Sequence, residues 1–130
     1  MQMLHVMTRS PEAIRPEDVL LKAKEMMDAG RFRRLPVVQE GRVVGILTER
    51  DLREHGGYLK STKVDAVMKA PVVTVDSKAS VEEAARLMLR NKIGGLPVVD
   101  GGKLVGIVTS TDLLRAFLNV LEATQKIVQR

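Results

Sequence analysis

The sequence contains no cysteine and very few aromatic residues. Its 130 residues include 2 phenylalanines, 1 tyrosine and no tryptophan. Without cysteine, disulfides, thiolate catalysis and cysteine-ligated zinc are excluded. Because aromatic residues are scarce, the core must be built from valine, leucine, isoleucine, methionine and alanine. A chain of this length forms one compact unit that buries roughly two thirds of its surface on folding.

Long apolar runs are also missing. No segment approaches the roughly 20 apolar residues that cross a bilayer, and the opening MQMLHVMTRSP is too short and interrupted for a secretory signal. These features predict a cytoplasmic protein without a membrane anchor. The net charge of +5 favours anionic partners, but it does not choose among nucleotide, nucleic acid and acidic protein.

An internal repeat organises the chain. Residues 33–52 (RRLPVVQEGRVVGILTERDL) return as residues 94–113 (GGLPVVDGGKLVGIVTSTDL), identical at 11 of 20 positions without a gap. The offset of 61, from Leu35 to Leu96, also aligns a Val-Met pair near the start of each copy. Units this small should bury their apolar faces against each other, in one domain with pseudo-twofold symmetry. The predicted boundaries are 1–57 and 62–117 for the repeats, 58–61 for a linker and 118–130 for a C-terminal helical extension.

Each repeat predicts a first strand and a first helix. A short extended piece, at residues 13–15 and again at 72–75, comes before a segment with apolar residues at helical spacing. The second of these helices opens with Ser80 and Glu83, three residues apart, as in a capping box. In the first repeat, Pro16 lies where a proline suits the first helical turn.

A hairpin and a second helix complete each predicted repeat. Leu-Pro-Val-Val and a second β-branched run flank a turn at residues 40–41 and again at 101–102, which is typical of a hairpin. The second helix follows Thr48 in one repeat and Thr109 in the other. The sequence therefore predicts an α/β (α+β) fold of two β-α-β-β-α repeats.

The repeated segments resemble the cystathionine β-synthase (CBS) domain. The order of elements, the Val-Met opening, Leu-Pro-Val-Val and above all GILTERDL and GIVTSTDL carry this resemblance, which covers the chain except for roughly its last dozen residues. Two copies in tandem are similar to the CBS pair called a Bateman module. The resemblance implies a ligand sensor that performs no catalysis. It also implies a symmetric homodimer in which two pairs form a four-domain disc.

The Thr-x-x-Asp pairs, Thr48 with Asp51 and Thr109 with Asp112, support two interpretations. Each threonine stands where a strand becomes a helix, so the pair can simply cap that helix. Alternatively, the free N–H groups of the first turn bind an anion, while the carboxylate accepts hydrogen bonds from the cis-diol of a ribose. The residues alone do not separate the two. The resemblance implies that these pairs face the ribose of an adenosine nucleotide, and we expect capping to coexist with binding.

The resemblance also implies the remaining residues of two ligand clefts between the repeats. Aliphatic strand residues would hold the base, although an isolated aliphatic residue is more often plain core. In such modules each cleft also uses the segment before Leu-Pro-Val of the opposite repeat. Carried over to this chain, the first cleft comprises Arg33, Arg34, Ile46, Thr48, Asp51, Val73, Ile93 and Gly94. The second cleft comprises Glu12, Phe32, Arg33, Ile107, Thr109 and Asp112.

An exchange of arginine for glycine makes the two predicted clefts unequal. The run RFRR at residues 31–34 corresponds to KIGG at 92–95. The arginine guanidinium can form bidentate hydrogen bonds with phosphate oxygens, although most arginines in proteins are simply exposed to solvent. We therefore expect the Asp51 cleft to bind phosphate more strongly through Arg33 and Arg34.

The glycines and an acid shape the rest of this asymmetry. Gly94 and Gly95 are expected to leave room beside this phosphate-binding site for the base or for backbone. Glu12 places a carboxylate at the rim of the second cleft. This carboxylate favours a neutral or cationic ligand there, such as S-adenosylmethionine.

Signatures of catalysis and of metal binding are missing. His5 and His55 are far apart, and His55 has no partner at metal-ligand spacing. There is no Walker-type loop, no dinucleotide glycine fingerprint, and no serine or carboxylate pair with a recognisable base. The sequence therefore predicts no enzyme, no metal and no cofactor. The expected ligand is AMP, ADP or ATP, and its binding would shift the population of arrangements that a regulated partner protein recognises.

Other classes of function stay open. S-adenosylmethionine and cyclic dinucleotides are alternative ligands, and a scaffold with empty clefts is another alternative. The 21 basic residues suggest nucleic acid, but the shortage of aromatic residues argues against a platform that stacks single-stranded bases. The tail offers an apolar face that packs either on its own module or on a partner helix. This face comprises Leu114, Phe117, Leu118, Leu121 and Val128.

Overall fold

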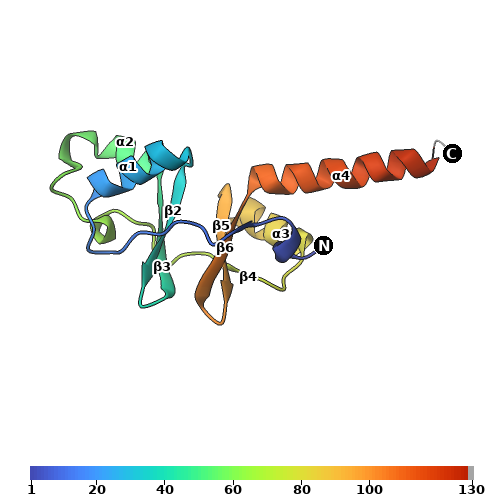
Figure 1. Ribbon diagram of the computed structural model, residues 1–130, viewed down its shortest axis with the longest axis horizontal. Helices are drawn as coiled ribbons and strands as arrows, with labels where there is room; N and C mark the ends of the chain where they lie inside the picture. The colour runs from blue at the N-terminus through green and yellow to red at the C-terminus, as the bar shows by residue number, and fades with distance from the viewer. Residues whose placement is uncertain (129–130) are drawn as a thin grey trace.

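The computed structural model describes residues 1–128 as a mixed α/β fold in which helices pack on a six-stranded sheet (Figure 1). The sheet has the strand order β2-β3-β6-β5-β4, with β1 paired to β6. The helices are α1 (Leu20–Gly30), α2 (Glu49–Glu54), α3 (Val81–Asn91) and α4 (Ser110–Val128). The strands are β1 (Thr8–Arg9), β2 (Arg34–Gln39), β3 (Arg42–Thr48), β4 (Val75–Asp76), β5 (Gly95–Asp100) and β6 (Lys103–Thr109). This architecture confirms the predicted fold class.

The two hairpins, β2–β3 and β5–β6, form as predicted and share one register. Leu35 pairs with Leu47 in the first hairpin, and Leu96 pairs with Val108 in the second. Their tight turns need positive φ at both central residues, which glycine adopts without strain. Gly101 and Gly102 supply φ values of 59° and 84° in the second hairpin.

The first helix of each repeat begins differently from the sequence-based expectation. α1 starts at Leu20, so the prediction that Pro16 belongs to its first turn is wrong. A turn closes before the helix, because the Asp18 carboxylate accepts a hydrogen bond of 3.0 Å from the Arg15 backbone N–H. At α3, Ser80 does accept a bond from the Glu83 backbone N–H, at 3.1 Å. Within residues 1–128 the return bond that would complete a capping box is absent.

The short extended pieces before these helices are shorter than predicted. In the first repeat only Ile14 pairs, in an isolated bridge to Val37. Pro16 has no N–H to donate, so the pairing cannot continue beyond it. In the second repeat the piece at 72–75 contributes only its last residue to β4, which runs parallel to β5.

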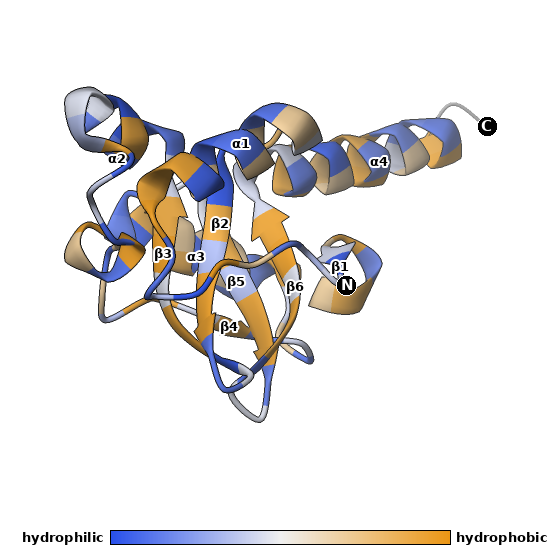
Figure 2. Ribbon diagram, turned by 60° about the vertical axis from the view of Figure 1, so that its left-hand side comes forward, coloured by the Kyte–Doolittle hydropathy of each residue, from blue (hydrophilic) through white to orange (hydrophobic). Residues whose placement is uncertain are grey.

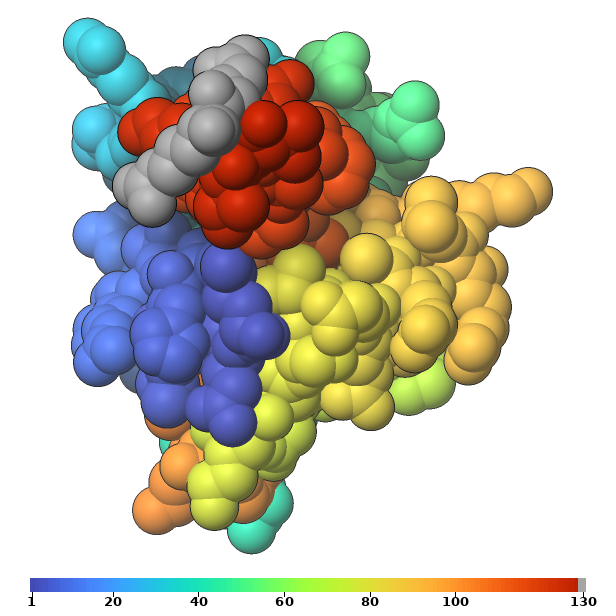
Figure 3. Space-filling view, turned by 90° about the vertical axis from the view of Figure 1, so that its right-hand side faces the viewer, coloured from blue at the N-terminus to red at the C-terminus, as the bar shows by residue number. Residues whose placement is uncertain are grey.

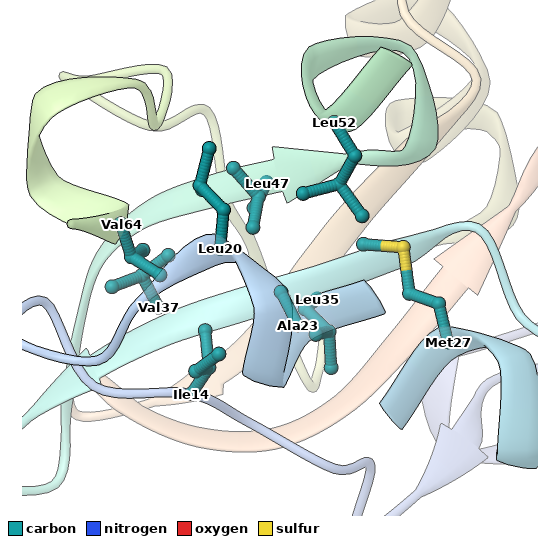
Figure 4. Packing of buried hydrophobic residues seen from close by; sticks show 9 residues of the cluster. All are labelled: Ile14, Leu20, Ala23, Met27, Leu35, Val37, Leu47, Leu52 and Val64. Carbon is teal, nitrogen blue, oxygen red and sulfur yellow. The ribbon is translucent and has the colours of Figure 1, made fainter. Parts of the chain in front are cut away.

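Two apolar clusters, rather than one shared core, hold the molecule together. The first contains Ile14, Leu20, Leu35 and Leu47 together with Val64 (Figure 4). Figure 2 shows the matching apolar colouring of the strands.

Segments exchanged between the repeats link these two clusters. Val64 precedes the Val-Met pair of the second repeat, yet it packs in the first cluster, while Met3 packs in the second. The central strands β3 and β6 pair only at Arg42 and Lys103. The repeats are therefore joined mainly by exchange of their N-terminal segments, which differs from the expected contact of two apolar faces.

Helix α4 continues well beyond the body of the molecule (Figure 1). Ala116 is its one buried residue among those described. The apolar side chains of Leu114, Phe117, Leu118 and Leu121 are exposed. Within residues 1–128, every helix is too short or too polar to cross a membrane.

Candidate functional site

Two clefts lie where the repeats meet, one on each side of the pseudo-twofold axis. The first has a volume of about 420 Å³ and the second about 350 Å³. The first is lined by Arg34, Ile46, Thr48, Arg50, Lys69, Pro71, Val72, Val73, Asn91, Lys92, Ile93, Gly94 and Gly95. The second is lined by Thr8, Ser10, Pro11, Glu12, Phe32, Arg33, Arg34, Ile107 and Thr109.

Most of the predicted site residues lie in these linings. In the first cleft, Arg34, Ile46, Thr48, Val73, Ile93 and Gly94 are present, whereas Arg33 and Asp51 are not. In the second, Glu12, Phe32, Arg33, Ile107 and Thr109 are present, whereas Asp112 is not. The structure thus brings the predicted residues together around two hollows. Neither aspartate contributes to these linings.

Thr48 and Asp51 form a reciprocal cap at the start of α2. Asp51 Oδ2 accepts hydrogen bonds from the Thr48 backbone N–H at 2.9 Å and from Thr48 Oγ1 at 3.0 Å. The Asp51 N–H donates to Thr48 Oγ1 at 3.3 Å. This is the capping interpretation of the Thr-x-x-Asp motif, and it leaves Asp51 buried, with 3% of its surface exposed.

Thr109 and Asp112 repeat this geometry at the start of α4. Asp112 Oδ2 accepts from the Thr109 N–H at 2.8 Å and from Thr109 Oγ1 at 3.0 Å. The second oxygen, Oδ1, lies 3.7 Å from a guanidinium nitrogen of Arg115. The side chain of Asp112 is more exposed than that of Asp51, at 16% against 4%. Asp112 is therefore the more accessible of the two carboxylates.

Lys69 distinguishes the first cleft from the second. Its ammonium group donates a hydrogen bond of 3.2 Å to Asp51 Oδ1, the oxygen that Thr48 leaves free. Both oxygens of Asp51 are thus already bound within the chain. Lys69 belongs to the second repeat, and its equivalent in the first repeat is Thr8, which lines the second cleft without a charge. Lys69 and Thr8 both directly follow a Val-Met pair, so the repeat alignment contained the signal that would have identified them.

Arg34 lies across the junction of the repeats and lines both clefts. A Cβ atom built on Gly94 would come within 2.6 Å of a terminal nitrogen of Arg34. The place that a side chain on either glycine would take is therefore occupied by the arginine, while both glycines also line the first cleft. Burial, and then the neighbouring Arg33, lower the pKa of the Arg34 guanidinium from its ordinary value.

The two linings differ in charge. The first carries four cationic side chains and no carboxylate: Arg34, Arg50, Lys69 and Lys92. The second combines two arginines with Glu12 and three hydroxyl-bearing residues. Arg33 belongs only to the second and lies 3.5 Å from Glu49. The cationic character expected of the first cleft is present, but most of it comes from residues that the sequence interpretation did not name.

Among residues 1–128, no cluster of three or more histidine, aspartate or glutamate side chains could hold a metal ion. His55, the histidine nearest to a cleft aspartate, lies with Nδ1 2.9 Å from the backbone oxygen of Asp51.

Fold and clefts together define a class of protein, a pseudo-symmetric pair of β-α-β-β-α units with a cleft on each side of their junction. The chain belongs to the CBS domain family, whose domain matches residues 4–57 and 64–119. It is therefore a CBS pair, a regulatory type of module.

Relatives of known sequence include both short proteins and parts of enzymes. A CBS domain-containing protein of Dictyostelium discoideum is 37% identical over an alignment 132 residues long, which covers 90% of this chain and 91% of that protein. Inosine-5′-monophosphate dehydrogenase of Mycobacterium tuberculosis is 37% identical over 111 residues, which span 84% of this chain but only 21% of the enzyme. The similarity to the dehydrogenase is confined to its CBS part.

Two solved structures share the fold and contain adenosine compounds. The CBS domain pair of protein MJ0100, in complex with 5′-methylthioadenosine and S-adenosyl-L-methionine, has a TM-score of 0.84 and 27% identity, covering 92% of this chain and 97% of that one. CBSX2 in complex with AMP has a TM-score of 0.79 and 28% identity, covering 92% of this chain and 97% of its own.

Proposed function

We propose that this chain is a cytoplasmic sensor that binds adenosine-containing nucleotides of the AMP, ADP and ATP class in the clefts between its repeats, without catalysing a reaction. One observation carries the proposal. The lining of the first cleft combines three aliphatic side chains, Ile46, Val73 and Ile93, with four cationic side chains and no carboxylate. An apolar wall suits a base, and the cations suit phosphate oxygens.

Asp51 takes part in this proposal only if Lys69 moves. A carboxylate oxygen that accepts a hydrogen bond from a ribose hydroxyl must be reachable from the cleft, and Asp51 Oδ1 is bound to Lys69 at 3.2 Å. A nucleotide would draw Lys69 away toward its phosphates and expose Oδ1 to the diol. The same ammonium group would then contribute to phosphate binding. Movement of Lys69 would therefore allow contacts to both the ribose and the phosphates of the nucleotide.

The second cleft favours a less anionic ligand. Glu12 stands in its lining, and the hydroxyls of Thr8, Ser10 and Thr109 provide neutral hydrogen-bonding groups. A neutral nucleoside or a cationic adenosyl compound such as S-adenosylmethionine fits this charge better than a polyphosphate does. The bound compounds in the MJ0100 structure are of this kind, which supports the assignment by similarity.

Binding to a folded protein raises its thermal midpoint, since a ligand at 100 times its Kd adds about 2.7 kcal/mol to the free energy of unfolding. We therefore propose thermal melting with AMP, ADP, ATP, S-adenosylmethionine, NAD and cyclic dinucleotides. The proteins are the wild type, Asp51→Ala and Asp112→Ala. Because both aspartates cap helices, each variant is compared with itself, with and without ligand.

The expected result is a nucleotide-dependent rise in the wild type that Asp51→Ala abolishes and Asp112→Ala preserves. Equal losses in the two variants would defeat the assigned inequality of the clefts. If no adenosine compound raises the midpoint, the clefts are empty and the module is a scaffold. A salt-dependent rise with RNA or DNA alone would instead support nucleic-acid binding.

The proposed sensor acts as a symmetric homodimer, in which ligand binding shifts the population of arrangements offered to a regulated partner protein. The exposed apolar face of α4 supports self-association.

A further inference from the structure

A second pair of grooves lies away from the clefts, between the two helices of each repeat. The groove between α1 and α2, here called the first-repeat groove, has a volume of about 420 Å³. It is lined by Lys24, Met27, Asp28, Glu49, Leu52, Arg53, Gly56 and Leu59. The groove between α3 and α4, here called the second-repeat groove, has a volume of about 530 Å³. It is apolar over most of its surface.

The two grooves occupy equivalent positions in the two repeats. Adding the repeat offset of 61 to each residue of the first-repeat groove gives a residue of the second-repeat groove. These counterparts are Ala85, Met88, Leu89, Ser110, Leu113, Leu114, Phe117 and Val120. Any difference between the grooves therefore reflects side chains at matched positions.

Charge is what separates the matched grooves. The first-repeat groove carries four charged side chains, which pair within the molecule: Lys24 with Asp28 at 2.7 Å, and Arg53 with Glu49 at 3.6 Å. Their counterparts are alanine, leucine, leucine and serine. Of the twelve residues that line the second-repeat groove, only Glu82 has a charged side chain.

The apolar side chains of the second-repeat groove are largely unburied. Leu89 is 80% exposed, Leu114 63% and Phe117 58%. Figure 3 looks along α4 from its free end and shows this helix beside α3, with the N-terminal residues close by. Figure 2 shows further apolar bands along the projecting part of α4. An exposed apolar surface of this kind marks a place where another molecule packs.

We propose that the second-repeat groove receives the second-repeat groove of another copy of this chain, so that like repeats face each other across a twofold axis. This inference rests on the self-association proposed above and fixes its orientation. A twofold interface must be self-complementary, because the same surface is used by both molecules. The second-repeat surface meets this condition, since its apolar lining residues, Leu114 and Phe117 among them, are exposed and can pack against their equivalents in the other copy.

The opposite orientation, with first repeats against second repeats, is disfavoured by desolvation. It would press the ion pairs of Lys24 and Arg53 against Leu89 and Leu114. Burying charges against an apolar surface leaves their lost hydration uncompensated. When like repeats meet, apolar side chains contact apolar ones, and the charged first-repeat groove stays in contact with water.

Cysteine cross-linking tests the orientation directly, because the chain contains no cysteine of its own. Two matched variants place one cysteine each at equivalent positions, Leu89→Cys and Asp28→Cys. The full chains are treated with a short bis-maleimide, alone and after equimolar mixing and refolding, with one variant carrying a size tag. We expect Leu89→Cys to cross-link to itself and the mixture to give no 28–89 product. A dominant 28–89 product, or a dimer without any 89–89 product, would overturn the proposal.

Exchanging matched residues between the grooves tests the surface itself. Leu114→Arg installs the first-repeat residue in the second-repeat groove, and Arg53→Leu is the reciprocal control. Sedimentation equilibrium should give a dimer dissociation constant at least tenfold higher for Leu114→Arg than for the wild type. For Arg53→Leu this constant should change less than twofold. Both side chains are exposed, so circular dichroism should show unchanged folding.

The failures of the two proposals remain distinguishable. A wild type that stays monomeric at all concentrations overturns the interface, while its thermal shift with nucleotide still reports on ligand binding. A dimer that shows no thermal shift overturns nucleotide sensing and leaves the orientation intact.

Discussion

The side chain of Arg34 lies against Gly95, the residue that holds the equivalent position in the second repeat. A Cβ atom on Gly95 would come within 2.6 Å of Arg34 Cδ. Because these equivalent positions meet at the pseudo-twofold axis, only one of them can carry a long side chain. The chain has arginine in the first repeat and glycine in the second, and the symmetry of the clefts is broken at this point.

Gly95→Ala should destabilise the protein by forcing Arg34 to move. The added methyl group would overlap the middle of the arginine side chain rather than its flexible end. Overpacking of this kind costs roughly 1–3 kcal/mol in the free energy of unfolding. Urea denaturation of the variant and the wild type measures the difference.

A double-mutant cycle identifies the cause. In an Arg34→Ala background the overlapping atoms are gone, so Gly95→Ala should cost much less than in the wild type. Gly57→Ala serves as the control, because no atom lies within 4 Å of a Cβ at that position. Equal costs with and without Arg34 would contradict the explanation.

Arg34→Met should weaken phosphate-bearing ligands in both clefts, since this guanidinium lines both. Loss of a charge-assisted contact to phosphate predicts about tenfold weaker AMP binding. Adenosine has no phosphate, so its affinity should change less than twofold. Isothermal titration calorimetry with the two ligands gives both numbers, and equal losses for adenosine and AMP would contradict a phosphate contact.

Arg33→Met is the matched control for this experiment, because Arg33 lines the second cleft alone. In an Asp112→Ala background, where the first cleft is the one that binds AMP, Arg33→Met should leave AMP affinity unchanged. In that background Arg34→Met should still reduce it. If Arg33→Met lowered AMP affinity and Arg34→Met did not, the phosphate contact would belong to Arg33 and our assignment to Arg34 would be wrong.

Exchanging Lys69 and Thr8 should change the ligand preference of the clefts in opposite directions. Lys69→Met removes a cation from the first cleft and frees Asp51 Oδ1. We expect ATP to bind about tenfold more weakly and adenosine to bind at least as well as before.

Thr8→Lys places the same ammonium group in the second cleft, where β1 pairs with β6 at Ile107. This variant should raise the affinity of the second cleft for ATP, measured by calorimetry in an Asp51→Ala background. If Thr8→Lys has no effect on ATP while Lys69→Met does, the cation at this position acts through Asp51 alone. The charge of the cleft would then not determine its preference.

Local patterns in the sequence predicted much of this structure. The capping of α2 by Thr48 and Asp51 depends on residues three apart, and the tight turn at Gly101 and Gly102 depends on residues that accept positive φ. Because such features are decided within a few residues, the repeated motif predicted both hairpins and both second helices.

Features set by contacts between distant segments were not predictable in the same way. The packing of Val64 in the first cluster and of Met3 in the second links positions far apart in the chain. The ion pair of Lys69 with Asp51, 18 residues away, likewise requires the exchanged segment to be in place. The resemblance to CBS domains suggested which residues surround each cleft, but not which of them already bind each other.

Asp18→Asn should reveal a pH-dependent contribution to stability at the start of α1. Only 8% of the Asp18 side chain is exposed. Burial acts to raise its pKa, but hydrogen bonds from the Arg15 side chain and backbone and from Lys22 outweigh burial, so the pKa lies below its ordinary value. A carboxyl whose pKa is lower in the folded state stabilises the protein above its unfolded pKa of about 3.9 and loses this effect as the pH falls through the folded value.

Urea denaturation of Asp18→Asn and wild type at pH 7 should therefore differ by about 1 kcal/mol, since the lost bonds involve charged groups but Arg15 is largely exposed. The difference should shrink as the pH is lowered from 5 toward 2.5, because protonation removes the same charge from the wild type. Asp65→Asn, at an exposed site without an ion pair among residues 1–128, should give no such trend. A difference that stays constant over this pH range would show that Asp18 acts by shape and neutral hydrogen bonding, and not by its charge.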